Sequence, residues 1–578
     1  TENGHQPMSN EDDSIWIVFN GEIYDFLDHR KDLEKKGHIL KSRTDSEIII
    51  HFYEEYGINC LKHLNGMFAF ALWDKNKERL WLVRDRVGIK PLHYYYNNKI
   101  LVFGSEIKAL LADPDIPKAI DSRALELYLT LNYIPAPHTI YRGIRKLEPG
   151  NYLLMEKGKI SVEKYWDVSS SGALSNDHGG NISECARQLF RSVEEAVKRR
   201  LIADVPLGAF LSGGIDSSII VALMARNSNS PVRTFSIGYR DIPNFDETGY
   251  AREVAEFNNT DHHEFKLESH DIISAFPEVL DTLDEPFADS SAIPTYIVSR
   301  ETRNHVTVAM SGDGGDELFA GYRMYRGEKW ARYFSLMPSF VNQNILAPAI
   351  NLLPDSRDNK FLEFNRRLKK FFRGVSNSFP VRYKNWREVF PAQLRRDLLT
   401  HSEYNDLYLE EIDRIFRAKE NLFKNDLINL MLYMDFTGLL HGDMLTKVDR
   451  MSMANSLEVR VPLLDHTVAE YAFKIKGNMK LRGKTGKFIL IHAFKDLLPP
   501  ALHKRPKAGF EIPLGVWFRK ELKFLINEYL CEDRLRKHDL FKWPAIQSLI
   551  KNHMNNKQDT SWHLWNLIVF QHWYEKYM

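Results

Sequence analysis

The order of apolar and polar positions divides the chain into two patterns. In the first pattern, up to about residue 167, short apolar runs alternate with turn residues, at Ile15–Phe19, Met67–Trp73, Leu80–Val83 and Leu101–Phe103. Runs at such close spacing are typical of antiparallel strands, and one helix-like stretch, Ser46–Tyr56, lies among them. The first pattern therefore predicts a mostly antiparallel α+β domain over residues 1–167.

The second pattern follows a stretch rich in Ser, Gly, Asn and Asp, which predicts a linker over residues 168–181. Apolar residues three or four apart then predict an amphipathic helix from Ile182 to Leu201. After it, predicted strands alternate with predicted helices: Val205–Leu211, Ile219–Met224, Val232–Ile237, Gly249–Phe257, Val306–Met310 and a helix beginning within Glu317–Tyr325. Such alternation predicts a doubly wound α/β domain over residues 182–578, mostly helical beyond about residue 330.

Composition narrows the possible partners. A chain of 578 residues is expected to form two or three domains, and 44% hydrophobic with 27% charged residues is ordinary for globular proteins. A formal net charge of +1 favours neither nucleic acid nor an anionic membrane as a main partner. The one local basic run is interpreted as a solvated helix face, formed by Arg366, Arg367, Lys369, Lys370 and Arg373.

The three cysteines and the histidine pair at residues 262–263 do not predict a metal site. Cys60, Cys185 and Cys531 lack zinc-ligand spacing and do not form a disulfide framework, and Cys60 lies between apolar residues as a core cysteine would. The pair His262–His263 lacks further ligands at useful spacing and is expected at the edge of a strand. With no signal peptide and no apolar run of about 18 residues, a cytoplasmic location without a membrane partner is expected.

The segment Ser212–Ser218 reads S-G-G-I-D-S-S and joins a predicted strand to a predicted helix. Gly213 and Gly214 allow a tight turn whose N–H groups converge beside the positive end of the helix, which makes an anion site. Ser212, Ser217 and Ser218 add hydroxyl donors. Asp216 would repel a phosphate unless a cation lies between them, which indicates Mg²⁺. The loop lacks the ending of a Walker A motif and resembles the pyrophosphate loop of adenylate-forming enzymes. An ordinary strand–helix turn is the alternative.

A second glycine-rich loop, Ser311–Glu317, reads S-G-D-G-G-D-E and also follows a predicted strand. In parallel sheets, ligands bind at the carboxyl ends of strands where the strand order reverses, so the two loops are expected to face each other there. Asp216 and Asp316 could then hold Mg²⁺ against a pyrophosphate. The alternative is that Asp316 and Glu317 only favour a helix N-terminus.

Further ordered motifs connect these loops to a known family. They are G-H-Q-P-M (Gly4–Met8), F-N-G-E-I-Y (Phe19–Tyr24), R-T-D-S-E (Arg43–Glu47), N-G-M-F-A-F-A-L-W-D (Asn65–Asp74), R-D-R-V-G-I-K-P-L (Arg84–Leu92), D-E-P-F-A-D-S-S (Asp284–Ser291), K-V-D-R-M-S-M-A (Lys447–Ala454), E-V-R-V-P-L-L-D (Glu458–Asp465) and K-R-P-K-A-G-F (Lys504–Phe510). With them, nearly the whole chain resembles the glutamine-hydrolysing asparagine synthetases, the asparagine synthase B family.

The resemblance implies two coupled activities. An N-terminal-nucleophile domain of the class II glutamine amidotransferase type hydrolyses glutamine, and ammonia passes through an internal tunnel. A synthetase domain of the ATP-pyrophosphatase type converts aspartate and ATP, with Mg²⁺, into β-aspartyl-AMP and pyrophosphate, and ammonia then displaces AMP to give asparagine. The implied substrates are aspartate, ATP and glutamine or ammonia, and the implied assembly is a homodimer.

The resemblance also implies roles for particular residues. Pyrophosphate and ATP would be bound by Ser212, Gly213, Gly214, Asp216, Ser217, Ser218 and Ser311, and the adenosine would be flanked by Leu211, Ser236, Ile237 and Gly312. Glutamine would be bound by Asn20, Gly21, Glu22 and Asp45. Asp313, Asp316 and Lys487 would be the catalytic set, with Lys487 neutralising charge on the phosphates. Without the resemblance, Lys487 reads as an exposed helix lysine.

Two departures from the family pattern leave alternatives open. The family often has Glu at the position of Asp313, so the acceptor could instead be a sugar, a peptide or a natural-product carboxylate. A non-catalytic protein with a degenerate synthetase fold is a further alternative.

The family's nucleophilic Cys and an Arg precede G-H-Q-P-M, whereas the sequence opens at Thr1. Either the first several dozen residues precede Thr1, or glutaminase activity is absent. Thr1 itself is not expected to act as the nucleophile.

Overall fold

The structure of the chain is a computed structural model. It describes residues 4–170, 181–240, 246–334, 338, 340–354, 360–401, 406–423, 426–505, 509 and 512–578. The linker predicted over 168–181 falls mostly on residues 171–180, which, like Thr1, lie outside the described residues.

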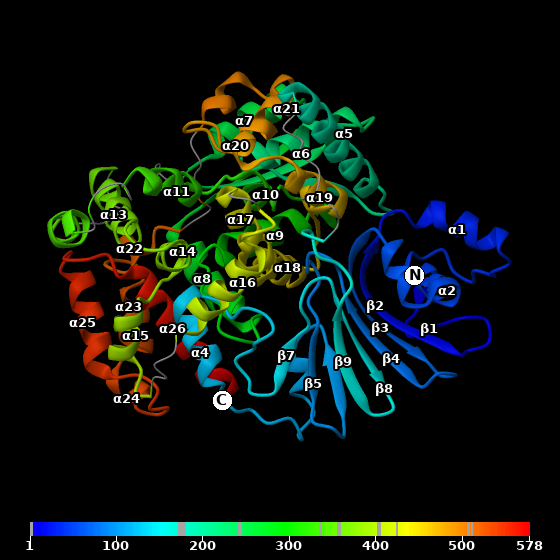
Figure 1. Ribbon diagram of the computed structural model, residues 1–578, viewed down its shortest axis with the longest axis horizontal. Helices are drawn as coiled ribbons and strands as arrows, with labels where there is room; N and C mark the ends of the chain where they lie inside the picture. The colour runs from blue at the N-terminus through cyan, green and yellow to red at the C-terminus, as the bar shows by residue number, and fades with distance from the viewer. Residues whose placement is uncertain are drawn as a thin grey trace.

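An antiparallel sheet forms most of the first domain (Figure 1). Its strands, in spatial order, are β1 (Met8–Ser9), β2 (Ile15–Ile23), β3 (Gly66–Asp74), β4 (Arg79–Arg84), β8 (Asn151–Glu156) and β9 (Lys159–Lys164). The helices α1 (Phe26–Lys35) and α2 (Ser46–Tyr56) and the 3₁₀-helix η2 (Gly57–Lys62) accompany the sheet. Apolar residues of α2 and the strands share one buried core, so the predicted α+β domain is confirmed.

A smaller antiparallel sheet leads from the first domain into the second. Its strand order is β6 (Leu101–Gly104), β5 (His93–Tyr96) and β7 (Ile144–Lys146). Along the chain, the helices α3 (Ile107–Leu110) and α4 (Ser122–Leu131) lie between β6 and β7. Helix α4 packs among the C-terminal helices, where the Tyr128 hydroxyl donates a 2.7 Å hydrogen bond to the carbonyl of Asn566 (Figure 1). The core of the second half therefore includes a helix from the first.

The second domain is built on a parallel sheet. Its strands, in spatial order, are β12 (Asp261–Leu267), β11 (Arg233–Tyr239), β10 (Leu207–Phe210), β13 (Val308–Met310) and β14 (Glu458–Arg460). The chain runs from β10 through β11 to β12, and then returns to the other side of β10 for β13. The strand order reverses between β10 and β13, so the predicted doubly wound sheet is confirmed. His262 and His263 lie on the edge strand β12, also as predicted.

Helices connect and flank these strands. They are α5 (Ile182–Arg200), α6 (Ile215–Arg226), α7 (Thr248–Phe257), α8 (Ser269–Asp281), α9 (Ala292–Arg303), α10 (Gly315–Phe319) and α11 (Arg323–Phe334). A helix is predicted to begin within Glu317–Tyr325, and α11 begins there at Arg323; the shorter α10 precedes it and ends before Ala320. Ala320 adopts a left-handed φ of 62°, and the N–H of Gly321 caps α10 by donating to the Asp316 carbonyl at 3.1 Å.

The remaining described segments are mainly helical, as predicted. They comprise η4 (Val341–Leu346), α12 (Ala347–Asn351), α13 (Lys360–Phe372), α14 (Phe379–Arg387), α15 (Ala392–Leu398), α16 (Leu407–Lys419), α17 (Leu427–Met434), η5 (Asp435–Met444), α18 (Leu445–Met453), η6 (Pro462–Leu464), α19 (His466–Lys474), α20 (Gly477–Lys480), α21 (Phe488–Phe494), η7 (Lys495–Leu497), η8 (Pro500–Lys504), α22 (Leu514–Trp517), α23 (Lys523–Tyr529), α24 (Glu532–Leu535), α25 (Trp543–Met554) and α26 (Ser561–Tyr577). Within the described ranges, every helix is too short or too polar to cross a membrane.

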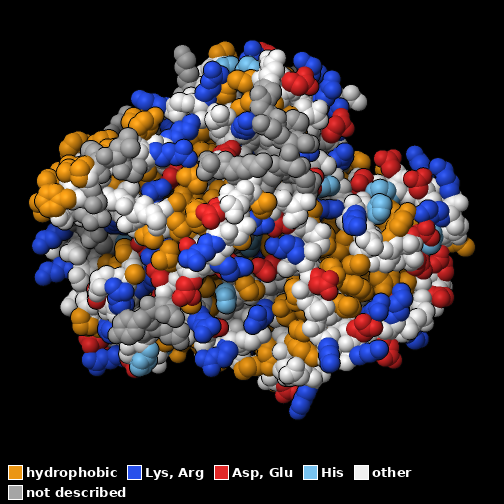
Figure 2. Space-filling model, viewed as in Figure 1, with side chains coloured by type: hydrophobic (Ala, Val, Ile, Leu, Met, Phe, Trp, Pro, Cys, Tyr) orange, Lys and Arg blue, Asp and Glu red, His pale blue; other side chains and the backbone are white. Residues whose placement is uncertain are grey.

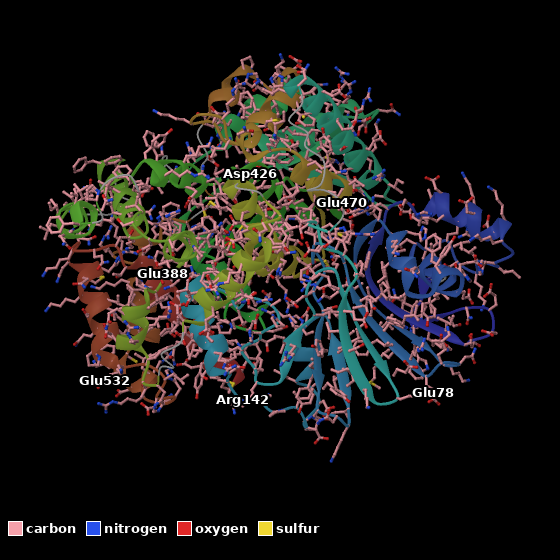
Figure 3. The ribbon with its side chains drawn as sticks, viewed as in Figure 1. Glu78, Arg142, Glu388, Asp426, Glu470 and Glu532 are labelled. Atoms are coloured by element: carbon pink, nitrogen blue, oxygen red, sulfur yellow. The ribbon has the colours of Figure 1, made fainter. Side chains whose placement is uncertain are left out.

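Polar contacts join the two domains beside the parallel sheet. The indole N–H of Trp166 donates to the carboxylate of Glu470 on α19 at 2.8 Å, and Figure 3 shows Glu470 on the side of α19 that faces the first domain. Lys90 forms a 2.9 Å ion pair with Asp449 of α18. These two contacts hold α18 and α19 of the second domain against the first domain.

Candidate active site

The two glycine-rich loops meet where the strand order reverses. The first loop follows β10 and the second follows β13, and these two strands are direct neighbours. A Cβ atom added to Gly312 would lie only 2.5 Å from the backbone nitrogen of Ser217. A side chain at Gly312 would therefore force the loops apart, which gives a physical reason for glycine there.

The first loop turns tightly into the start of α6. Gly213 has a φ of 66°, a left-handed conformation that glycine adopts without strain. The Ser212 hydroxyl accepts from the Gly214 N–H at 3.3 Å and lies 3.1 Å from the Ser217 hydroxyl. The Ser218 hydroxyl is buried and donates to the Gly214 carbonyl at 2.6 Å.

Lys487 joins the two loops through their carboxylates. Its ammonium lies 2.5 Å from Asp316 Oδ1 and also forms an ion pair with Asp216 Oδ2. Its backbone N–H donates to the Phe319 carbonyl at 2.9 Å, just before α21 begins. The lysine is only 7% exposed, so its interpretation as an exposed helix residue is wrong.

The acidic surroundings set the charge of Lys487. Burial alone would lower the pKa of this lysine, but the carboxylates of Asp216 and Asp316 outweigh burial and hold it well above its usual value. Next to them, burial followed by the charge of Asp316 raises the pKa of Glu317 to about 7, while the Tyr322 hydroxyl donates to its carboxylate. Two oxygen ligands facing one cation position form a donor set that suits Mg²⁺.

The residues expected around the adenosine lie on neighbouring strands. Leu211 extends β10 and donates its N–H to the Phe235 carbonyl of β11 at 2.7 Å. Ser236 and Ile237 follow on β11, with the Ser236 hydroxyl 3.1 Å from His262 Nε2.

The acidic loop is held by its own hydroxyl and by β14. The N–H of Ser311 donates to the Arg460 carbonyl at 2.9 Å, and the Ser311 hydroxyl donates to Asp313 Oδ2 at 2.5 Å. Asp313 is therefore folded back on its own loop and is not in the Lys487 bridge.

Two basic residues beside the loops were not singled out from the sequence. The ammonium of Lys447 donates to Asp289 at 3.0 Å and to the Ser291 hydroxyl at 2.9 Å. The guanidinium of Arg505 donates to the Gly213 carbonyl and lies 4.2 Å from the centre of the Tyr250 ring. The sequence could have indicated both residues, because each lies in a motif that supports the family resemblance.

The residues predicted to bind glutamine lie at the junction of the domains. Asn20 and Gly21 on β2 line a cavity together with residues of the second half, including Thr307, Ser456 and Glu458. The Asn20 amide donates to the Ser105 hydroxyl at 3.1 Å.

The two carboxylates of this predicted pocket are half-buried, with 32% of the Glu22 side chain exposed. Asp45 accepts the N–H of Ile23 at 2.7 Å. Burial, followed by the charges of Asp45 and Glu458, raises the pKa of Glu22 to about 8. A carboxyl group with so high a pKa carries a proton at neutral pH and can donate a hydrogen bond.

Comparison with known proteins agrees with this architecture. Residues 1–166 match the glutamine amidotransferase domain family, and residues 188–575 match the asparagine synthase family. The chain is 33% identical to asparagine synthetase [glutamine-hydrolyzing] 1 of Bacillus subtilis, over 99% of this chain and 87% of that protein. It is 32% identical to a putative asparagine synthetase [glutamine-hydrolyzing] of Mycobacterium tuberculosis, over 99% and 86%.

More distant relatives are named for other activities. Amidase chyE of Penicillium rubens is 26% identical, over 96% of this chain and 85% of that protein. Among solved structures, a Bacillus subtilis glutamine phosphoribosylpyrophosphate amidotransferase aligns with 45% of this chain and 64% of its own, with a TM-score of only 0.22.

An amidotransferase domain joined to a parallel-sheet domain with paired glycine-rich loops defines the class as amide-forming ligases. Within that class, the chain belongs to the asparagine synthase family. ATP use follows from membership of this family of ATP-dependent synthetases.

Proposed function

We propose that this enzyme makes asparagine from aspartate and ATP, with glutamine or ammonia as the nitrogen donor. The side-chain carboxylate of aspartate attacks the α-phosphorus of ATP and pyrophosphate leaves. Ammonia then attacks the acyl carbon of the β-aspartyl-AMP and AMP leaves. Each step exchanges one bond for another, so no further reactant is needed.

The observation that carries the proposal is the bridge from Lys487 to Asp216 and Asp316. It brings a buried cation and two carboxylates to the point where two glycine-rich loops meet at the ends of β10 and β13. A site with this composition suits a polyphosphate that must be neutralised before its α-phosphorus can be attacked.

Particular residues take the ATP. Ser212, Ser217 and the N–H groups of Gly213 and Gly214 bind the pyrophosphate part, because they lie at the N-terminus of α6. Asp216 and Asp316 would hold Mg²⁺, which when bound offsets the charge of the phosphates. Lys487 neutralises charge that develops on the α-phosphate. Leu211, Ser236, Ile237 and Gly312 surround the adenosine, with Ser218 and Ser311 supporting the loops.

Glutamine is bound in the first domain. Asn20, Gly21, Glu22 and Asp45 recognise its polar groups beside the cavity at the domain junction. Ammonia released there reaches the second domain, and the assembly is a homodimer, as the family resemblance implies.

The test is ATP–pyrophosphate exchange by the full chain, with aspartate compared against other carboxylic acids. Exchange that requires aspartate supports the proposal. Exchange that requires a different acid identifies another acceptor, which the distant amidases make the second candidate. Absence of exchange with every acid would overturn adenylate chemistry for this site.

A further inference from the structure

Three separate segments of the first domain bring imidazole and carboxylate groups to one point, away from the two glycine-rich loops. Glu11 lies in the turn between β1 and β2, His38 follows α1, and His51 is in the middle of α2. One ligand atom from each of the three lies within 4.8 Å of the other two. The N–H of Ile39 donates to Glu11 at 3.0 Å, which holds the His38 segment against the turn.

A fourth group, Glu54, lies between the two imidazoles. Its Oε2 atom is 2.7 Å from His51 Nδ1 and 3.3 Å from His38 Nδ1, and Glu11 Oε2 is 3.9 Å from His51 Nδ1. In a tetrahedral site with metal–ligand distances of about 2.1 Å, neighbouring ligand atoms are about 3.4 Å apart. Glu54 therefore lies within this spacing of both imidazoles, and Glu11 lies slightly beyond it from His51.

Burial and charge favour a cation at this point. His51 is 1% exposed, and its second ring nitrogen, Nε2, lies 3.9 Å from Glu47, without a hydrogen-bond partner among the described residues. Glu55 lies on the other side of His38, 3.1 Å from its Nε2. Four carboxylates thus surround two imidazoles, and Figure 2 shows acidic side chains along the outer edge of this domain, beside α2. A bound divalent ion would relieve their mutual repulsion.

We propose that Glu11, His38, His51 and Glu54 form a binding site for a divalent transition-metal ion of the Zn²⁺ type. Imidazole nitrogen and carboxylate oxygen together suit Zn²⁺, whereas Mg²⁺ and Ca²⁺ prefer oxygen ligands alone. The ion joins the turn between β1 and β2, the segment after α1, and α2. It is independent of the ATP site and serves as a structural clamp on the helix that follows Asp45.

Metal binding by the full chain, stripped of metal with a chelator, tests this site. Equilibrium dialysis against Zn²⁺, without nucleotide, is expected to show about one tightly held equivalent per chain. Glu11→Gln and His38→Gln are each expected to weaken the affinity about tenfold or more. The matched controls are Glu78→Gln, an exposed glutamate on another turn, and His63→Gln, an exposed histidine that stacks on Tyr56; both should retain wild-type affinity.

A second readout separates ligation from folding. Thermal unfolding of the metal-free proteins should give the same midpoint for wild type and Glu11→Gln, whereas added Zn²⁺ should raise the midpoint of the wild type alone. Co²⁺ bound in place of Zn²⁺ should give the visible bands of a tetrahedral site. The proposal is overturned by any of three results: no stoichiometric Zn²⁺ in the wild type, unchanged affinity in both cluster variants, or an equal loss in the controls.

Discussion

Lys487 Nζ lies 2.5 Å from Asp316 Oδ1, and this contact ties the start of α21 to the loop after β13. The same ammonium pairs with Asp216 of the other loop. One buried cation therefore fixes the spacing of two carboxylates that would otherwise repel each other. A ligand or metal ion that enters between the loops must share these carboxylates with the lysine.

Removal of either carboxylate charge is expected to stop adenylate formation. Asp216→Asn and Asp316→Asn each keep the size of the side chain but remove a charged ligand for Mg²⁺. ATP–pyrophosphate exchange is expected to fall by about 10²-fold or more in each variant. Circular dichroism should show that both variants remain folded.

Asp261→Asn is the matched control, since Asp261 is an exposed aspartate on the edge strand β12. It should exchange pyrophosphate at the wild-type rate. Near-normal exchange by Asp216→Asn or Asp316→Asn would show that the two loops do not form one metal-assisted site.

Loss of the Lys487 ammonium is expected to slow the reaction more than it weakens ATP binding. A cation directed at charge that develops on the α-phosphate acts in the transition state, so Lys487→Met should lower the rate of adenylate formation about 10²-fold or more. Direct ATP binding should change much less. Lys484→Met, at an exposed lysine three residues earlier, is the control.

The reverse pattern in Lys487→Met would contradict the assigned role. If the apparent ATP affinity fell strongly while the rate at saturating ATP stayed near wild type, Lys487 would serve ground-state binding only.

The sequence predicts the two loops well because the signals are local. Each loop is a short glycine-rich run directly after an apolar strand, and the strand–helix alternation places both at the carboxyl edge of one sheet. Helix α2 is predicted with its observed bounds, Ser46–Tyr56, because the apolar residues of the helix and the polar residues at its two ends are all close together in the sequence.

Other features depend on contacts between distant parts of the chain. The ion pair between Lys487 and Asp216 joins positions 271 residues apart. The residues next to Lys487 in the sequence do not indicate that its side chain is buried. Strand β14 is only three residues long, so it has no periodicity of its own. The helix breaks at Ala320 because Gly321 caps it and Lys487 lies close by. Helix propensities of single residues do not predict either contact.

Close contact between the loops can be tested without a change in charge. Gly312→Ala is expected to abolish most pyrophosphate exchange, because its Cβ would lie 2.5 Å from the Ser217 nitrogen and would push the first loop away. Gly249→Ala is the control, since a Cβ at this position in α7 meets no atom within 4 Å. Wild-type exchange by Gly312→Ala would show that the loops need not touch during catalysis.

The raised pKa of Glu22 makes a prediction about stability and pH. In the folded protein its pKa is about 8, compared with an ordinary value of 4.5. Between these values the folded state holds a proton that the unfolded chain has released, so stability falls as pH rises through this window and the cost is complete above about pH 8.

Glu22→Gln should remove this dependence, because an amide stays neutral at every pH. The variant is expected to gain about 1 kcal/mol or more of stability relative to the wild type at about pH 9, and none at about pH 4. Thermal unfolding at the two pH values measures the difference, with the exposed Glu78→Gln as control at the turn shown in Figure 3. An equal shift of the midpoint at both pH values would mean that folding does not raise the pKa of Glu22, which would contradict this prediction.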